Sequence, residues 1–487
     1  MNPPKTESSA RRIWQGATIL GLLLFAAAVV VACSSMTSSS GTGMGTVSVL
    51  LSDPATCQAP NGPFAHVYVT ITDVQANQSA TAGDNDSGWT DLTPSLSKAP
   101  AQVDLLGLAN NQCFLATMGD ALQLQQGSYQ QIRVLLAPNS GTLYGANCGN
   151  ANNCVVLTAD NSVHALALSS EAQTGIKIPS GQISGGSFTI GAGQTKDLDI
   201  DFNTCVSILQ EGNGQYRLKP VLHAGEVSAT SSSINGTVLD GSTGNPVNGL
   251  VTVSLEQKDA SGIDRVIMTQ NVNADGTWVI CPVTEGNTMS PYDIVITAAS
   301  LDGKTMYAPT IITGVSIGST TGTVKLNPPA PALATASIAM LTGAVNSVGS
   351  AAGVSIDVLA GVLEQVNSTW YTIPLPMTTT QTSAELGLTT VASTTTAPCT
   401  PTTADCASYT MQLPSSGAYI GVWAASGSTF AEPVALATYE VDGTATSVST
   451  GALDCSPTEL QSTPASALTG GGPFNVTVPT IQFSSCQ

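Results

Sequence analysis

The chain has 487 residues, 42% of them hydrophobic and only 9% charged, and 13 basic residues face 32 acidic ones, for a net charge of -19. This balance excludes electrostatic binding to nucleic acid, which requires a basic surface, and the apolar content argues against a disordered chain. Because the whole chain has only three histidines, catalysis by histidine clusters is disfavoured as well. We therefore expect a non-enzymatic protein with no nucleic-acid partner.

The first 32 residues predict a secretory signal. Three basic residues precede the apolar run 13–32, and Cys33 follows it. The sequence VVAC at 30–33 resembles the bacterial lipobox, which implies removal of the signal peptide 1–32 and a lipid anchor, such as palmitate, on Cys33. A Ser/Gly-rich stretch within 33–45 predicts a flexible tether.

Two anchors are compatible with this N-terminus. Ser34, where Asp would indicate inner-membrane retention in lipoproteins, favours the cell outer membrane or the cell surface. The alternative is a single uncleaved transmembrane helix, since about 20 apolar residues cross a hydrocarbon core of roughly 30 Å. Both alternatives place the rest of the chain in the cell envelope, outside the cytoplasm.

Ten cysteines remain after Cys33. An even number in an oxidising compartment predicts disulfide bonds rather than metal thiolates. The candidate pairs are Cys148 with Cys154, Cys399 with Cys406, Cys455 with Cys486, and Cys57 with Cys113. Cys205 and Cys281 are left over, and the sequence alone does not determine the connectivity.

Short runs of Val, Ile, Thr and Tyr between Gly, Asn, Asp, Ser and Pro clusters predict an all-β fold of tandem β-sandwich domains after the N-terminal signal or anchor helix. The best candidate for a further helix is 102–124. Two changes of composition, SATSSS at 228–233 and NPPAPALATAS at 327–337, mark boundaries. The predicted parts are a first domain (46–227), a second unit (234–326) and a third unit (338–487).

The second and third units read as diverged copies of one module. Residues 234–239, INGTVL, match 340–345, MLTGAV, and a Gly-rich turn and an alternating strand follow in each. The order of these phrases resembles the carboxypeptidase regulatory-like, or transthyretin-like, β-sandwich. The resemblance implies a sandwich in both units, with a Thr-rich insert at 378–403 in the third.

The first domain carries a second set of recognisable phrases. They are VSVLLSDP at 47–54, VYVTITDV at 67–74, GSYQQIRV at 127–134, LDIDFN at 198–203 and GQYRLKPV at 214–221. Together they resemble a bacterial lipoprotein domain of unknown function, catalogued under the number 4382. The resemblance implies an extracytoplasmic β-rich fold without an assigned activity. Asn203 stands where that family usually carries Asp.

Alternating aspartates give the first candidate site. Asp197, Asp199 and Asp201 would lie on one face of a strand, roughly 6.6 Å apart. Aligned carboxylates can begin a Ca²⁺ site, although Phe202 stands where a calcium loop has Gly. The alternative is a solvated strand face, and no other cofactor is expected.

Large aromatic residues give the second candidate site. Trp370 and Tyr371 are adjacent, so in a strand they point to opposite faces and one should be exposed. With Trp423 they are candidates for a sugar-stacking platform, and the alternative is that they fill sandwich cores. The G-x-S-x-G pattern at 314–318 lacks a following helix and a downstream histidine, which argues against a hydrolase.

The sequence thus favours a non-catalytic lipoprotein of the cell envelope with a binding, adhesion or structural role. Its partners would be the membrane, through the lipid anchor, and glycans or other envelope proteins. The first alternative is a carbohydrate-binding accessory protein of polysaccharide use. A hydrolase is the second alternative.

Overall fold

The structure is a computed structural model. It describes residues 43–52, 63–108, 116–168, 174–202, 204–210, 214–219, 222–227, 233–259, 261–281, 283, 291–327, 336–348, 355–375, 385–389, 406–433, 435–447, 455, 459–469, 474–484 and 486. The predicted signal peptide, Cys33 and the tether up to residue 42 lie outside these residues.

The predicted all-β fold is confirmed. In the described part of the chain the helical elements are four short ones, namely α2 (Leu105–Leu108), α3 (Thr204–Ser207), η1 (Ser180–Gln182) and η2 (Ser184–Gly186). The candidate helical stretch 102–124 contains the short helix α2, and strands occupy half of its described residues. None of the described helices has the length and apolar character needed to cross a membrane.

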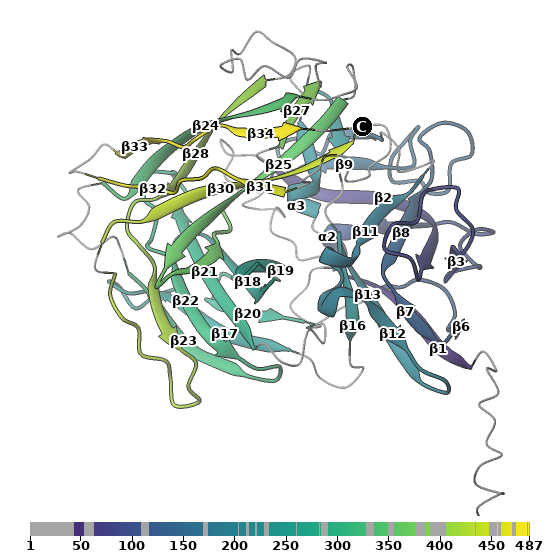
Figure 1. Ribbon diagram of the computed structural model, residues 1–487, viewed down its shortest axis with the longest axis horizontal. Coiled ribbons are helices and arrows are strands. Elements are labelled where there is room, and N and C mark those ends of the chain that lie inside the picture. The colour runs from purple at the N-terminus through teal and green to yellow at the C-terminus, as the bar shows by residue number, and fades with distance from the viewer. Residues whose placement is uncertain are drawn as a thin grey trace, which may run out of the picture.

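The first domain packs two sheets around one hydrophobic core, on the right of Figure 1. The first sheet has the order β16 (Leu222–Val227), β13 (Thr195–Phe202), β1 (Met44–Ser52) and β5 (Ala116–Thr117), with β6 (Leu122–Gln125) also on β1. The second has the order β11 (Ile176–Pro179), β8 (Gln131–Leu136), β2 (Phe64–Asn77), β9 (Cys154–Leu157), β10 (Val163–Ala167), β15 (Tyr216–Leu218) and β14 (Ile208–Gln210). On β2 lie also β3 (Thr90–Asp91) and β4 (Ala101–Asp104), while β7 (Gly127–Tyr129) pairs with β12 (Phe188–Ile190).

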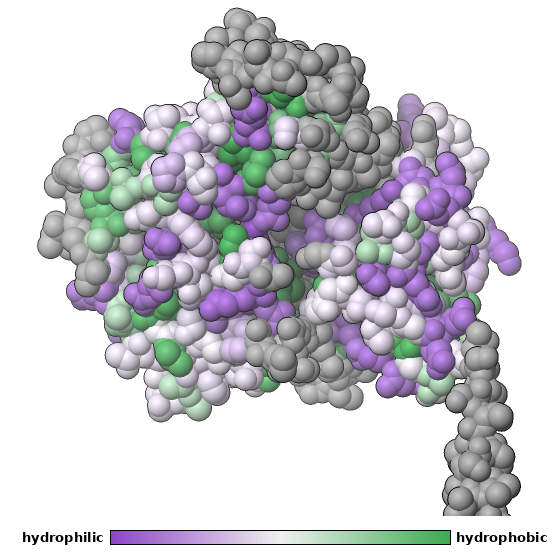
Figure 2. All heavy atoms as spheres, viewed as in Figure 1, coloured by the Kyte–Doolittle hydropathy of each residue, from purple (hydrophilic) through white to green (hydrophobic). Residues whose placement is uncertain are grey.

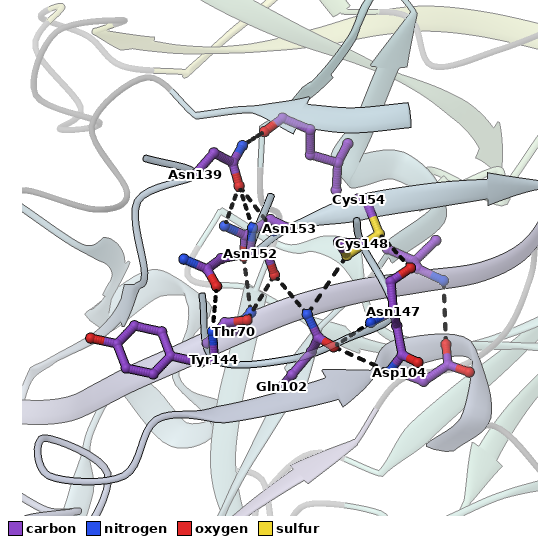
Figure 3. The surroundings of a disulfide bond; sticks show 12 residues. Thr70, Gln102, Asp104, Asn139, Tyr144, Asn147, Cys148, Asn152, Asn153 and Cys154 are labelled. Atoms are coloured by element: carbon purple, nitrogen blue, oxygen red, sulfur yellow. Dashed lines mark hydrogen bonds between the residues drawn. A yellow bond between two sulfur atoms is a disulfide. The ribbon is translucent and has the colours of Figure 1, made fainter. Parts of the chain in front are cut away.

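A disulfide and an asparagine network lie on one side of this domain (Figure 3). Cys148 and Cys154 are bonded, as the sequence predicts. Next to them Asn153, which is fully buried, accepts a hydrogen bond from the Thr70 backbone N–H (2.9 Å) and donates to the Ala137 carbonyl (2.8 Å). Buried amides with every partner in place hold a unique loop conformation.

The second unit is a sandwich of its own. Its smaller sheet has the order β20 (Thr277–Ile280), β17 (Ile234–Asp240) and β23 (Thr320–Leu326). Opposite it lie β22 (Thr310–Val315), β21 (Tyr292–Ser300), β18 (Gly249–Lys258) and β19 (Ile263–Asn271). Trp278, 2% exposed, fills the core between the two sheets, as large aromatic residues in sandwiches do.

Strands of the third unit extend the sheet of the second unit on both sides. The edge strand β19 pairs in parallel with β26 (Thr369–Thr372), and the edge strand β22 pairs in parallel with β29 (Tyr419–Val422). Beyond β26 the same sheet continues through β25 (Ser355–Val366), β30 (Thr438–Ser447) and β31 (Glu459–Gln461), with β27 (Glu385–Thr389) on β25 and β32 (Ser466–Ala467) on β30. The two units therefore share one sheet, on the left of Figure 1.

A further sheet completes the third unit. Its order is β28 (Cys406–Pro414), β24 (Ile338–Val348) and β33 (Phe474–Thr477), with β34 (Ile481–Ser484) also on β24. Val295 and Ile311 of the second unit belong to the hydrophobic core of the third, whereas their neighbours Ile294 and Ile312 belong to the core of the second. Strands β21 and β22 are thus covered on both faces, which explains their continuous apolar runs.

Polar contacts reinforce the joint between these two units. Arg265 on β19 donates from Nη1 to Asp442 Oδ2 at 2.6 Å and also pairs with Glu459, both in the third unit. The Thr297 hydroxyl donates to the Pro374 carbonyl at 2.6 Å. Side chains and strand edges together make the second and third units one packed body.

Disulfides continue in this body. Cys455 and Cys486 are bonded to each other, as predicted from the sequence. Cys281 takes part in a disulfide, and so does Cys406. The other predicted half-cystines, Cys57, Cys113 and Cys399, lie outside the described residues.

We expect the substitution Asn153→Ala to destabilise the first domain by about 3 kcal/mol, because it leaves the buried Thr70 N–H and Ala137 carbonyl without their side-chain partner. Chemical denaturation of the full chain measures this change. The matched control is Asn150→Ala, at an exposed position of the same loop, which should change stability by less than about 0.5 kcal/mol. Equal effects of both substitutions would contradict the structural role of the network.

Candidate functional site

A cavity of about 850 Å³ lies at the joint between the second and third units. Both units contribute to its wall, because β26 and β29 add to the two edges of the four strands that belong to the second unit. The lining residues are Lys258, Asp264, Pro291, Asp293, Thr313, Gly314, Asn367, Tyr371, Ile420, Gly421, Val422, Thr429, Phe430 and Ala431.

Strand register brings carboxylates together at this cavity. In β18, Val253 and Leu255 face the core of the second unit, so the alternating Ser254 and Glu256 face the other side. Glu256 lies opposite Asp293 on β21. Asp264 on β19 lies opposite Lys258 on one side and Tyr371 on the other. Cross-strand partners share a face of the sheet, so one face collects three carboxylates.

The three carboxylates are buried but differ in their hydrogen bonds. Glu256 is fully buried and accepts from the Ser254 hydroxyl (2.9 Å) and the Thr372 N–H (3.2 Å). Asp293 accepts from the Gly314 N–H at 2.9 Å. Asp264 is 1% exposed, and its Oδ2 has no hydrogen-bond partner among the described residues. Such an unsatisfied buried oxygen is costly and calls for an explanation.

Burial changes the acidity of these groups. It raises the pKa of Asp264 to about 7, helped by the charge of Asp293 and opposed by Lys258. Burial also raises the pKa of Glu256 well above its ordinary value, against the hydrogen bond from Ser254, and raises that of Asp293. Perturbed carboxyl groups in a cavity are a common property of functional sites.

The chemistry of the lining favours binding over reaction. The described lining residues include no His, Cys or Ser, so no nucleophile paired with a base faces the cavity. Carboxylates, an ammonium group, hydroxyls and an amide supply hydrogen-bonding groups, and Ile420, Val422 and Phe430 supply apolar contact. This mixture is typical of a small-molecule or side-chain binding site.

The three aspartates predicted as a calcium site do share one face of β13, but that face is not solvated. Asp199 is fully buried and Asp201 is 3% exposed. The Ser52 hydroxyl donates to Asp199 Oδ2 at 2.7 Å, and burial raises the pKa of Asp199 to about 7. The expectation of a solvated face is therefore wrong for Asp199 and Asp201, while Asp197 is half-buried. Within the described part of the chain, no group of three His, Cys, Asp or Glu side chains, these included, is placed to hold a metal ion.

The predicted aromatic platform is not assembled on one exposed face. Tyr371 is 3% exposed and lines the cavity. Trp423 packs against the core of the second unit, and its indole N–H donates to the Thr320 carbonyl at 3.2 Å. Trp370 is half-buried. Of the three predicted ligand-binding residues, only Tyr371 lies in the described lining of the cavity.

Comparison with known families finds a match in the first domain. Residues 44–220 match the family model described as Domain of unknown function (DUF4382). This match confirms the resemblance predicted from the phrases of the first domain. A search of curated proteins found no match to the chain.

Several solved structures align with the chain at low identity. The Bacillus anthracis TIE protein aligns at 8% identity and a TM-score of 0.15, covering 91% of this chain and 51% of that one. A streptococcal ancillary pilin aligns at 9% identity and a TM-score of 0.16, covering 90% of this chain and 99% of that one. Two B repeat units of the Staphylococcus aureus collagen-binding protein align at 10% identity and a TM-score of 0.16, covering 91% of this chain and 99% of that one. The chain thus spans about half the length of the first, and TM-scores this low do not indicate a shared overall fold.

Sequence reasoning missed Glu256, Asp264 and Asp293, because each stands alone in its strand phrase. A signal was present: charged residues interrupt runs such as VTVSLEQK at 251–258 and YDIVITAAS at 292–300, where strands covered on both faces are otherwise apolar. Figure 2 shows that hydrophilic and hydrophobic side chains form small alternating patches on this face of the molecule. The hydropathy of the surface on this face therefore does not distinguish the joint from its surroundings.

We expect the stability of the joint to fall as pH rises from about 4 to about 7. Carboxyl groups with a raised pKa keep their protons in the folded chain where the unfolded chain releases them, and Glu256, Asp264 and Asp293 behave in this way beside Lys258 and Tyr371. The substitution Asp264→Asn removes one of these groups. It should raise the melting temperature at pH 8 by about 2–4 °C and leave it nearly unchanged at pH 4.

Calorimetry of the full chain at both pH values measures this difference. The control is Glu432→Gln, which removes an exposed carboxylate next in sequence to the lining residue Ala431. It should change the melting temperature at neither pH. Parallel melting curves for Asp264→Asn and the unsubstituted chain would contradict the raised pKa of Asp264.

Proposed function

We propose that the protein is a non-catalytic lipoprotein of the cell envelope that holds a ligand in the cavity between its second and third units. The observation that carries this proposal is the Asp264 carboxylate, which is buried in the cavity wall with one oxygen unpartnered. A ligand group that supplies the missing hydrogen bond would offset the free-energy cost of burying this carboxyl group.

The disulfides support a location outside the cytoplasm. Cys148 with Cys154 and Cys455 with Cys486 form bonds, which persist mainly in oxidising compartments. The signal-like start and the lipobox-like residues before Cys33 are consistent with export and a lipid anchor. With the Ser/Gly-rich tether, this arrangement would present the binding body at the outer membrane or cell surface. The carboxypeptidase regulatory-like character of the second unit stays a prediction.

Rigid walls support binding at the joint. Strand pairing on both edges fixes β26 and β29 against the second unit, and the Arg265 ion pairs hold β19 to the third unit. A preformed cavity lowers the entropic cost of holding a ligand. Glycans, one of the alternative ligand classes considered from the sequence, would meet Tyr371 here rather than an open platform.

A thermal-shift screen of the mature chain against sugars, amino acids, organic amines and organic acids tests the binding role. At least one class should raise the melting temperature by several degrees. The substitution Ala431→Trp, which fills the cavity from an exposed lining position, should abolish that rise. Ala424→Trp, outside the described lining, is the matched control and should preserve it. If no class stabilises the unsubstituted chain, or if Ala431→Trp keeps the full shift, the binding role is wrong.

The anchor is tested separately with Cys33→Ala. Without the thiol no lipid can be attached, so we expect the protein to move from the membrane fraction to the soluble fraction and to lose metabolic labelling with palmitate. Cys33→Ala leaves the apolar run 13–32 intact. Full membrane retention would therefore indicate a transmembrane helix instead of a lipid anchor.

A further inference from the structure

Acidic groups outnumber basic groups around the cavity. Glu256, Asp264 and Asp293 are each at most 6% exposed, and Lys258 is the one cation among the described lining residues. Lys258 itself is exposed and forms no ion pair within 4.0 Å among the described residues. Buried carboxylates without a partner either take up protons or attract a cation.

The rim of the cavity is apolar on the side of the third unit. Val422 is 71% exposed, the largest exposure among the exposed large hydrophobic residues in the described part of the chain. Ile420 and Phe430 lie in the same lining, with Pro291 from the second unit. An exposed valine beside a buried acidic floor fits a ligand that has both an apolar body and a polar end.

We propose that this cavity takes an organic cation, an ammonium or guanidinium group on an apolar body, with the charge on Asp264 and the body against Val422 and Phe430. This inference rests on the proposed binding function and names the class of its ligand. A free amine and the basic side chain of a peptide share this chemistry. The aromatic rings of Tyr371 and Phe430 add cation–π attraction.

The hydrogen-bond pattern favours an organic cation over a metal ion. Glu256 uses both carboxylate oxygens, and Asp293 uses one, on groups of the protein. Asp264 is the group with a buried open oxygen. A Ca²⁺ ion needs six to eight oxygen ligands, whereas one ammonium group needs a single carboxylate and a few neutral acceptors, which Thr313, Asn367 and Thr429 can provide.

The test is titration calorimetry on the full mature chain with probes that differ only in charge. One arm compares phenethylamine with 2-phenylethanol. A second arm compares acetylated tripeptide amides that carry Lys, Arg or norleucine between two alanines. In each arm that shows binding, we expect the cationic probe to bind at least about tenfold more tightly than its neutral counterpart. This difference in affinity should shrink as salt is added.

Variants locate the charge. Asp264→Asn should weaken binding of the cationic probe about tenfold or more, while Glu432→Gln, an exposed carboxylate outside the described lining, should leave it unchanged. Val422→Ser tests the apolar rim at a position too exposed to disturb folding, and should weaken binding about threefold.

The outcomes separate the two sources and the two proposals. Tighter binding of the basic peptides than of the amine assigns a peptide side chain, and the reverse assigns a free amine. Equal affinity for charged and neutral probes, or full affinity in Asp264→Asn, would overturn the cation assignment. If another ligand class stabilises the chain in a way that Ala431→Trp abolishes, the binding function holds and this inference fails. No stabilisation by any class removes both.

Discussion

Main-chain hydrogen bonding between the second and third units is the constraint on which the rest of this structure depends. An unpaired strand edge offers a row of N–H and C=O groups that must find partners. Here the edge strands β19 and β22 find them in β26 and β29, strands from the other unit. This pairing merges two sandwiches into one body, in which the cores of the two units cover the two faces of β21 and β22 and residues of both units line one cavity.

The same pairing explains why the acidic groups are tolerated. Glu256, Asp264 and Asp293 lie on the face of the shared sheet that turns away from the core of the second unit, at the border of the third. Packing there is incomplete, so a cavity remains, and the backbone N–H groups of Thr372 and Gly314 satisfy two of the carboxylates. Local rules of burial are broken mainly at functional or strained sites, and the unpartnered oxygen of Asp264 is one such break.

The first domain uses buried polar groups differently. Its asparagine network and the Cys148–Cys154 bond satisfy their own partners and fix loop geometry. One oxygen of Asp199 accepts from Ser52, and the other has no hydrogen-bond partner among the described residues, but Asp199 does not belong to the described lining of the cavity. These groups serve the fold, whereas the carboxylate of Asp264 faces a cavity, and this contrast is why the candidate site lies at the joint rather than at the aspartates whose alternation drew attention first.

The sequence by itself indicated the all-β class, because strand periodicity is a local property, and the resemblance of the first domain to a known family, because its phrases are local too. It also indicated the Cys148–Cys154 bond, whose cysteines lie six residues apart, whereas the Cys455–Cys486 pair, 31 residues apart, was one of several possible pairings. It predicted sandwiches in the second and third units but treated them as separate, since nothing local shows which edge strands will pair. Strand alternation was enough to predict that Asp197, Asp199 and Asp201 share one face. The burial of Asp199 and Asp201 depended on what packs against that face in the folded chain. Only the tertiary structure decided that Asp264, Tyr371 and Val422 line one cavity, because parallel pairing joins residues more than 100 positions apart through backbone hydrogen bonds that carry no sequence signature.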